Sequence, residues 1–311
     1  MTDRAEIARA AAAEVLGAPP ETFASPLAVL ASPAWRGVEG DIWRAEAGGR
    51  AVIVKHYHPD TAFYVPVGPA IAAARQAGDL GIGPAVLSAD EAAGIIVLDC
   101  LPASWRAGGL HDVVVPEIRA AVVAAKKAFH AGPALPRSAS IFEEIDAFAR
   151  IVAAEGVSCH RHLPVFLEVI DGARAKIAAT GADSRPCHRD GNTANLMVGP
   201  GGAVQLVDFD LAANCDPYEE LGCHLAEFFD CEPEARQGFE EWEGRFDEAL
   251  FQRAMLYGMA DDLRWGLIGA IMAARSPRKS LEFAKYASWR LMRLETMALS
   301  SRAADRLRRA A

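Results

Sequence analysis

Residues 187–210 read CHRDGNTANLMVGPGGAVQLVDFD, and this stretch gives the clearest indication of the fold. The run VGPGG is a turn between two strand-like runs, so the second half of this stretch is predicted to be a β-hairpin. Side chains on a strand alternate every two residues, which places Asp208 and Asp210 on the same side. The turn folds Asn195 back beside them, and a short loop brings Asp190 to the mouth of the hairpin.

The carboxylates of this stretch would repel one another unless a positive charge lies among them. A divalent hard cation such as Mg²⁺ resolves the repulsion, because it takes oxygen ligands from one or two carboxylates together with phosphates. Along the chain come a base (Asp190), a metal-binding amide (Asn195) and a metal-binding carboxylate (Asp208). Phosphoryl transfer from ATP requires these parts and also a cation on the α- and β-phosphates. Lys55, in the apolar strand-like run AVIVKHY, is predicted to supply that cation.

Each of these residues has an ordinary structural explanation when it is taken singly. An Asp before a turn is usually a cap, and a lone Lys in a strand usually extends to solvent. The four residues together, in this order and on matching secondary structure, favour the catalytic interpretation.

The first hundred residues predict a small, mostly β lobe. An N-terminal amphipathic helix ends at Gly17 and Pro19, and a second helix is expected at 69–80. Strand-like runs lie at 26–30, 41–47, 50–57, 83–90 and 93–100.

Beyond residue 101 the pattern changes to long helical segments, and the hairpin is the only β signal. The helices are expected at 112–131, 139–154, 163–180, 218–230, 245–274 and 279–309. The fold class is therefore α+β, with a nucleotide-binding lobe at 1–101, a mostly α-helical lobe at 102–311 and a tight hinge between them.

Composition and charge limit the classes of function. The chain has 311 residues, of which 51% are hydrophobic, so it can form a large core. Its formal net charge of −9 argues against general nucleic-acid binding and is compatible with a cationic small-molecule substrate. The longest apolar run, 265–274, is too short to span a bilayer, and the N-terminal helix is not a secretion signal. The six cysteines have no paired spacing, which indicates reduced thiols and a cytoplasmic protein. The oligomeric state is not fixed by the sequence.

With these motifs the sequence resembles the aminoglycoside phosphotransferase and choline/ethanolamine kinase group, which has a two-lobed protein-kinase-like fold. The likeness extends from AVIVKHY to the region of Arg293. It implies ATP and Mg²⁺ as cofactors, with Asp190 as the catalytic base. It further implies that Asn195 and Asp208 bind Mg²⁺ and that Lys55 contacts the ATP phosphates.

The resemblance also implies nucleotide contacts from two other segments. These are the glycine loop RGVEGD, with Gly37 and Gly40, and the hinge segment LDCL, with Asp99, Cys100 and Leu101. The hinge would receive the adenine through backbone hydrogen bonds.

Two features depart from the family pattern. Ala70 stands where the small-lobe helix of the family usually has a glutamate that pairs with the strand lysine. Glu39 and Asp41, in the glycine loop, would repel ATP phosphates unless their side chains point outward. The missing glutamate leaves three outcomes open. Another carboxylate takes its place beside Lys55, the enzyme is slow, or the protein binds its ligand without transferring phosphate.

The acceptor is expected to be choline or a related amino alcohol. Residues 214–229 are similar to the choline kinase segment after the metal aspartate, and Glu227 falls where that family has a cation-facing carboxylate. A quaternary ammonium favours aromatic faces with a carboxylate nearby. Trp265, Tyr286 and Trp289 are the aromatic residues that the resemblance places around it.

Three alternatives remain open from the sequence. Trp265 shares a helical face with Ile268 and Met272, which is also the pattern of a core stripe. The acidic run at 229–250 offers carboxylates for an aminoglycoside or amino-sugar substrate, although a solvated helix face also explains it. A silent kinase-like binding protein is the third alternative.

Overall fold

The computed structural model describes residues 4–26 and 37–310. Of the strand expected at 26–30, everything after Pro26 lies outside the described residues. Within them, no helix combines the length and the apolar character that a membrane span requires.

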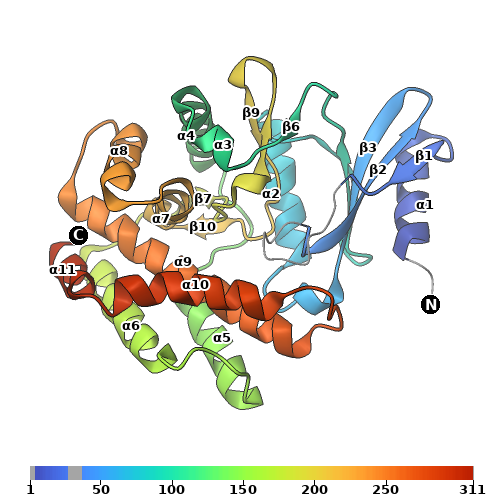
Figure 1. The fold of residues 1–311 in the computed structure, drawn as a ribbon. Coiled ribbons are helices and arrows are strands. Elements are labelled where there is room, and N and C mark those ends of the chain that lie inside the picture. The colour runs from blue at the N-terminus through green and yellow to red at the C-terminus, as the bar shows by residue number, and fades with distance from the viewer. Residues whose placement is uncertain (1–3, 27–36, 311) are drawn as a thin grey trace.

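The small lobe is a five-stranded antiparallel sheet in the order β1-β2-β3-β5-β4. Its strands are β1 (Thr22–Ala24), β2 (Gly40–Ala47), β3 (Arg50–Tyr57), β4 (Val86–Asp90) and β5 (Ile95–Asp99). Helix α1 (Arg4–Leu16) packs on this sheet, where Ala8 and Ala12 meet Val52 and Val54 (Figure 1). Small alanine side chains let the helix lie close to the β-branched residues of the strand.

The second helix of this lobe, α2 (Val67–Asp79), begins two residues before the predicted start at Pro69. Pro69 stands in the first turn, where a helix leaves its N–H groups without intrahelical partners, so the missing N–H of proline costs nothing there. A short 3₁₀ turn, η1 (Pro59–Thr61), connects β3 to α2.

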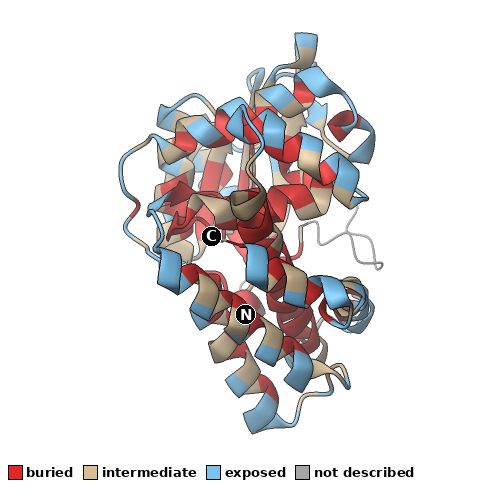
Figure 2. Cartoon of the chain, turned by 90° about the vertical axis from the view of Figure 1, so that its left-hand side faces the viewer, coloured by how far each residue is buried: buried red, intermediate tan, exposed pale blue. Residues whose placement is uncertain are grey.

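The large lobe is mostly helical, as predicted. Its helices are α3 (Leu110–Val113), α4 (Pro116–His130), α5 (Ile141–Glu155), α6 (Leu163–Thr180), α7 (Pro217–Phe228), α8 (Glu232–Glu243), α9 (Glu248–Arg275), α10 (Phe283–Ala298) and α11 (Ser301–Arg309). Helix α9 is buried along most of its length and contacts α5, α6, α7, α10 and α11. Buried residues face the interior and exposed residues the outer helix faces (Figure 2). The two-lobed α+β fold is confirmed.

Two predicted helices are divided, and one helix was not predicted. The helix expected at 112–131 divides into α3 and α4, because Pro116 cannot continue a helix but can begin one. The helix expected at 279–309 divides between α10 and α11 at Leu299. The acidic run forms a helix of its own, α8, which ends at Gly244 with a left-handed φ of 77°.

The hairpin is also confirmed. It consists of β8 (Leu196–Val198) and β9 (Val204–Leu206), with η3 (Pro200–Gly202) as the turn and η2 (Thr193–Asn195) before it. The prediction that the hairpin is the only β structure in this lobe is wrong. β6 (Arg106–Ala107) extends its sheet, and β7 (Arg185–Cys187) pairs with β10 (Ala213–Cys215). These strands have two or three residues, too few for an alternation pattern to be visible.

Candidate active site

The loop that follows β7 carries Asp190, the predicted base. Its Oδ1 accepts a hydrogen bond from the backbone N–H of Asn192 at 2.8 Å, and its Oδ2 accepts one from Nδ2 of Asn195 at 3.0 Å. Asp190 and Asn195 therefore meet directly, as predicted from their spacing. Burial raises the pKa of the Asp190 carboxyl above its ordinary value.

Lys55, on β3, joins the small lobe to the acidic stretch of the large lobe. Its Nζ lies 2.6 Å from Oδ1 of Asp208 and 2.6 Å from Oδ2 of Asp210. Burial opposes the charge of Lys55, but the two carboxylates outweigh it and hold the pKa of Lys55 well above its ordinary value. The hydroxyl of Tyr57 donates to the other oxygen of Asp210 at 2.9 Å. The lysine is thus a fixed positive charge beside the predicted metal ligand.

Glu39, in the glycine loop, points into the same site. Its side chain is buried, and the hydroxyl of Tyr64 donates to its Oε1 at 3.2 Å. One oxygen each from Glu39, Asp208 and Asp210 lie within 4.8 Å of one another. Burial and then the Asp208 carboxylate raise the pKa of Glu39 to about 8.

The neighbouring acid of the glycine loop, Asp41, lies elsewhere. Its carboxylate accepts a hydrogen bond from Arg4 at 2.6 Å and lies 3.3 Å from Nε2 of His58. Asp41 is therefore neutralised outside the site. Of the two loop acids, only Glu39 remains among the groups that would face phosphates.

The donor set fits a hard divalent cation. Glu39, Asp208 and Asp210 offer carboxylate oxygens, the ligands that Mg²⁺ prefers, around one lysine. Without a cation this crowding is relieved by protons. Burial and then Asp208 raise the pKa of Asp210 to about 7, while Lys55 keeps the pKa of Asp208 low against the opposing effect of burial. Asp208 is thus the carboxylate of this group that is fully ionised at neutral pH.

The backbone geometry of Asp208 differs from the prediction. β9 ends at Leu206, and Asp208 has a φ of 68°, in the left-handed region. Asp208 and Asp210 nevertheless converge on Lys55, so the prediction that they lie together is confirmed while the regular strand geometry is not. Arg189 has a φ of 67° beside the base, and such unusual conformations cluster at functional sites.

His188 ties the two acidic loops together. Its Nε2 lies 2.9 Å from the carbonyl oxygen of Val207, and its Nδ1 accepts from the backbone N–H of Asp190 at 3.3 Å. The Nε2 contact requires a proton on that nitrogen, because a carbonyl oxygen can only accept. The ring also packs edge-on against Phe209, with centroids 4.6 Å apart.

A buried network of ion pairs supports the loop that carries Asp190. The Arg189 side chain is fully buried and binds Glu219 at 2.6 Å and Glu144 at 2.8 Å. Arg264 donates to the carbonyl of Arg189 at 2.9 Å and pairs with Asp261 at 2.6 Å. The charges of these arginines are compensated at every step, as buried charges require.

Of the two predicted nucleotide segments, the glycine loop lies against this cluster. Gly37 has a φ of 66°, which favours glycine, and Gly40 begins β2. A Cβ on Gly40 would lie 2.8 Å from the carbonyl oxygen of His56 and 3.0 Å from Cγ of Lys55, so only glycine lets the strands approach here. Asp99, which ends β5, is exposed, and Cys100 and Leu101, which follow it, are partly buried.

Comparison with known proteins adds the family. The sequence matches the family described as "Phosphotransferase enzyme family" over residues 31–257, which is most of the chain. The chain belongs to this phosphotransferase family. No curated protein matches it by sequence.

Solved structures resemble this phosphotransferase over nearly its full length. A choline/ethanolamine kinase family protein from Mesorhizobium loti has 22% identity and a TM-score of 0.79, covering 97% of both chains. The choline kinase LicA from Streptococcus pneumoniae has 16% identity and a TM-score of 0.78, covering 94% of this chain and 98% of its own. The aminoglycoside phosphotransferase APH(4)-Ia, in a mutant ternary complex with ADP and hygromycin B, has 14% identity and a TM-score of 0.64, covering 94% and 98%. At these identities the likeness establishes the fold.

Two of the predicted acceptor residues, Glu227 and Tyr286, lie near Asp190, the predicted base. Glu227 packs against Gly191, where an added Cβ would come within 2.8 Å of its Cγ. Burial raises the pKa of Tyr286, and the Asp190 carboxylate contributes to that rise. The ring of Tyr286 contacts Trp265 edge-on, with centroids 6.2 Å apart. Glu227 and Tyr286 therefore lie near Asp190, and Trp265 lies beside Tyr286.

Two of the predicted acceptor residues differ from expectation in their surroundings. Glu227 is not an open carboxylate, because it forms ion pairs with both Arg290 and Arg293. Trp289 is 53% exposed, and its described ring contact is with the ammonium of Lys285 at 5.6 Å. It does not belong to the buried aromatic pair.

Trp265 lies in the same hydrophobic core cluster as Ile268 and Met272. The interpretation of these three residues as a core stripe is therefore correct.

Sequence reasoning missed two carboxylates of the site. Asp210 was placed beside Asp208 by the strand period but was given no role, although it binds Lys55 directly. Glu39 was recognised only as a possible source of repulsion. No local signal marked its inward position, because that position depends on Tyr64 and on carboxylates far away in the sequence. Ala70 occupies the helix position where a glutamate was expected to pair with Lys55. Asp208 and Asp210 pair with Lys55 instead.

Proposed function

We propose that this phosphotransferase uses ATP and Mg²⁺ to phosphorylate a hydroxyl of a small cationic acceptor, and that choline or a related amino alcohol is that acceptor. The observation that carries the proposal is that the ion pair Lys55–Asp208 and the bonded pair Asp190–Asn195 lie close enough for the Asp208 carboxylate to act on Asp190. In phosphoryl transfer most of the catalysis comes from positioning and charge, which this set of groups can provide.

Asp190 is the proposed general base. Its two oxygens are oriented by Asn192 and Asn195, and its pKa is raised by burial. A carboxylate with a raised pKa accepts a proton from an alcohol more readily than an ordinary one. Its task is to orient the acceptor hydroxyl and to take its proton as the new P–O bond forms.

Lys55 and the carboxylate group serve the nucleotide. Lys55 keeps its charge and is proposed to move from the carboxylates toward the α- and β-phosphates when ATP binds. Asp208, Asn195 and Asp210 would hold Mg²⁺, which when bound neutralises charge on the phosphates. Glu39 would either join these ligands or withdraw with the glycine loop.

The acceptor site supports a small amino alcohol. Tyr286 lies near Asp190, the proposed base, and contacts Trp265 edge-on. Aromatic faces attract a cation that cannot donate hydrogen bonds, so this pair supports the proposed acceptor. Because Glu227 is already shared by two arginines, the aromatic pair is proposed to provide the principal attraction.

The acidic run at 229–250 does not favour an aminoglycoside. Several of its carboxylates are occupied by arginines: Glu232 and Glu248 bind Arg236, and Glu241 binds Arg119. A polycationic sugar would have to compete with these ion pairs. The acidic residues of this run are therefore better explained by ion pairs at the surface than by binding of an aminoglycoside.

The test is a turnover screen with Mg²⁺ and ATP against choline, ethanolamine and a set of aminoglycosides, following ADP formation. We expect product with an amino alcohol and a rate that Asp190→Asn lowers by about 10²–10⁴-fold, the usual contribution of a general base. Asp190→Asn should bind Mg²⁺–ADP nearly as well as the wild type, since Asp190 is assigned to the acceptor.

Two results would contradict the proposal. If Asp190→Asn loses ADP affinity as severely as Asp208→Asn, the division of roles is wrong. If ATP stabilises the protein against heat equally with and without Mg²⁺, and no acceptor is phosphorylated, the protein is a nucleotide-binding module without transferase activity.

A further inference from the structure

The cluster around Lys55 contains one group to which the proposed function gives no task, the hydroxyl of Tyr57. Lys55 and Tyr57 lie two residues apart on β3, so their side chains point to the same side of the strand. The Tyr57 hydroxyl donates to Oδ1 of Asp210 at 2.9 Å, and Oδ2 of the same carboxylate lies 2.6 Å from Nζ of Lys55. Asp210 thus joins the tyrosine to the lysine.

The ring of Tyr57 makes a second contact with the lysine. Nζ of Lys55 lies 4.8 Å from the centroid of the ring, within the range of a cation–π interaction. The side chains of Tyr57 and Asp210 are buried, and electrostatic contacts are stronger where water is excluded. Tyr57 therefore acts on Lys55 both directly and through Asp210.

The two carboxylates on Lys55 are not equivalent. The side chain of Asp208 is 20% exposed and that of Asp210 is 6% exposed. The more open carboxylate is the better ligand for a metal ion that arrives with ATP, and the enclosed one is the better fixed partner for the lysine. An ionised carboxylate accepts contacts from several partners, so this task is compatible with the contact to Mg²⁺ proposed for Asp210.

Helix α2 offers no carboxylate to hold the lysine. Asp79, its only acid, is exposed at the C-terminal end, and Ala70 is buried where a glutamate was expected. Asp60, between β3 and α2, is bound by Arg278 at 3.0 Å. The task of holding Lys55 is therefore left to its partners on the large lobe and to its neighbour on β3.

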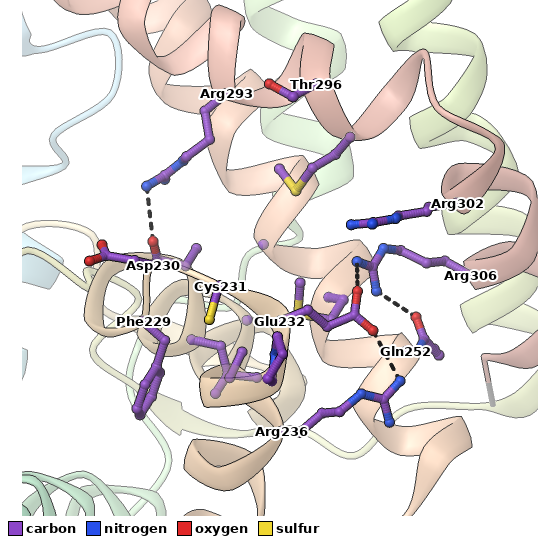
Figure 3. A pocket seen from close by; sticks show the side chains of 18 of the residues that line it. Phe229, Asp230, Cys231, Glu232, Arg236, Gln252, Arg293, Thr296, Arg302 and Arg306 are labelled. Atoms are coloured by element: carbon purple, nitrogen blue, oxygen red, sulfur yellow. Dashed lines mark hydrogen bonds and ion pairs between the residues drawn. The ribbon is translucent and has the colours of Figure 1, made fainter.

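The large lobe shows a contrasting case, in which ion pairs serve packing. A cavity of about 840 Å³ lies between α7, α8, α9, α10 and α11, and neither Lys55 nor Tyr57 is among its described lining residues (Figure 3). At this cavity Glu232 accepts hydrogen bonds from Arg236 at 3.0 Å and from Arg306 at 2.8 Å. Those contacts join helices of one lobe. The contact between Lys55 and Asp210 instead joins β3 to the loop between β9 and β10, across the two lobes.

We propose that Tyr57 is a positioning residue of the transfer reaction, which holds Lys55 through Asp210 and through its own ring in place of a glutamate on α2. The assignment rests on the proposed function. Where Asp208 serves as the metal ligand, Asp210 is the carboxylate that remains for Lys55 and keeps its Nζ directed at the phosphate site. A charged group that is fixed in advance loses less freedom when the nucleotide binds.

The test is titration calorimetry of the full-length protein with ADP and Mg²⁺, which requires no acceptor. Tyr57→Phe keeps the ring and removes only the hydroxyl, so this variant should fold. We expect its Kd for ADP to rise about tenfold, the effect of one hydrogen bond to a charged group. In a Lys55→Met background the same change should leave the Kd nearly unaltered, because the hydroxyl acts through the lysine.

Tyr257→Phe is the matched control. Tyr257 is also buried, and its hydroxyl donates to Asp216 at 2.9 Å in the large lobe. Its loss should lower the unfolding temperature and leave the Kd for ADP unchanged.

Three results would overturn the assignment of Tyr57. Tyr57→Phe binds ADP as the wild type does, or it weakens binding equally with and without Lys55, or Tyr257→Phe weakens binding as much. In each of these cases the hydroxyl serves the fold only. A wild type that binds no ADP overturns the proposed function itself, and the assignment falls with it.

Discussion

At the residue scale, the site depends on two side chains whose backbone is in an unfavourable conformation. Arg189 and Asp208 are the non-glycine residues with positive φ in the described part of the chain, and each such conformation costs on the order of 1–3 kcal/mol. Arg264 holds the carbonyl of Arg189, and Lys55 holds the carboxylate of Asp208. The strain is maintained by the same contacts that arrange the catalytic groups.

Glu39 should make the stability of the metal-free protein depend on pH. Its pKa is raised from an ordinary 4.5 to about 8 in the folded chain. Between these values the unfolded chain releases a proton that the folded chain keeps, so folding stability is lost as the pH rises from about 4.5 through 8. Since one pKa unit corresponds to about 1.4 kcal/mol, the loss is on the order of a few kcal/mol.

Glu39→Gln removes this titration. Urea unfolding in EDTA at pH 5.5 and pH 8 should show the variant gaining stability over the wild type as the pH rises. Glu240→Gln, an exposed change of the same type on α8, should show no such trend. A difference between wild type and Glu39→Gln that is constant with pH would mean that Glu39 is ionised in the folded chain.

At the element scale, α7 and α9 pack through glycine. A Cβ on Gly222 of α7 would lie 2.4 Å from the carbonyl oxygen of Ala254 and 2.7 Å from the backbone nitrogen of Gly258, both on α9. Backbone atoms cannot move aside without moving the helix. The close approach places Glu227, five residues further along α7, against the loop of the base.

Gly222→Ala should therefore destabilise the protein by about 1–3 kcal/mol, although alanine favours a helix more than glycine does. The matched control is Gly172→Ala on α6, where the Cβ would meet only the flexible end of Leu307 at 3.3 Å. That variant should be neutral or slightly more stable. Thermal unfolding of the two variants compares them directly, and an equal effect would show that the α7–α9 contact adapts without cost.

The elements also show what sequence patterns can determine. Apolar periodicity located most of the long helices, and proline explains why the segment expected at 112–131 breaks at Pro116. Strands such as β10 are too short to carry a pattern and exist because β7 offers a partner, which is a tertiary contact. The spacing of Asp190, Asn195 and Asp208 predicted their convergence, because local turns bring them together. The inward turn of Glu39 was not predictable, because it depends on Tyr64 and on carboxylates far away in the sequence.

At the scale of the whole molecule, the segment after α9 returns to the small lobe and holds the glycine loop (Figure 1). Asp60, in η1, accepts hydrogen bonds from Ser276 at 2.6 Å and from Arg278 at 3.0 Å. Arg278 also donates to the carbonyl of Val38 at 2.6 Å, next to Glu39. The large lobe thereby fixes the backbone of the loop that would cover the phosphates.

Arg278→Gln should loosen this loop and weaken the binding of Mg²⁺–ATP. Loss of its charge-assisted hydrogen bonds to Asp60 and Val38 is expected to raise the Kd for the nucleotide about tenfold, because the loop would have to be ordered at the moment of binding. Calorimetric titration with ADP and Mg²⁺ measures this without any acceptor. Arg275→Gln is the control, since Arg275 pairs with Glu155 at 2.9 Å on the exposed surface and touches no part of the loop. If both variants bind the nucleotide as the wild type does, the glycine loop keeps its position through the small lobe alone, and the link between the lobes serves stability only.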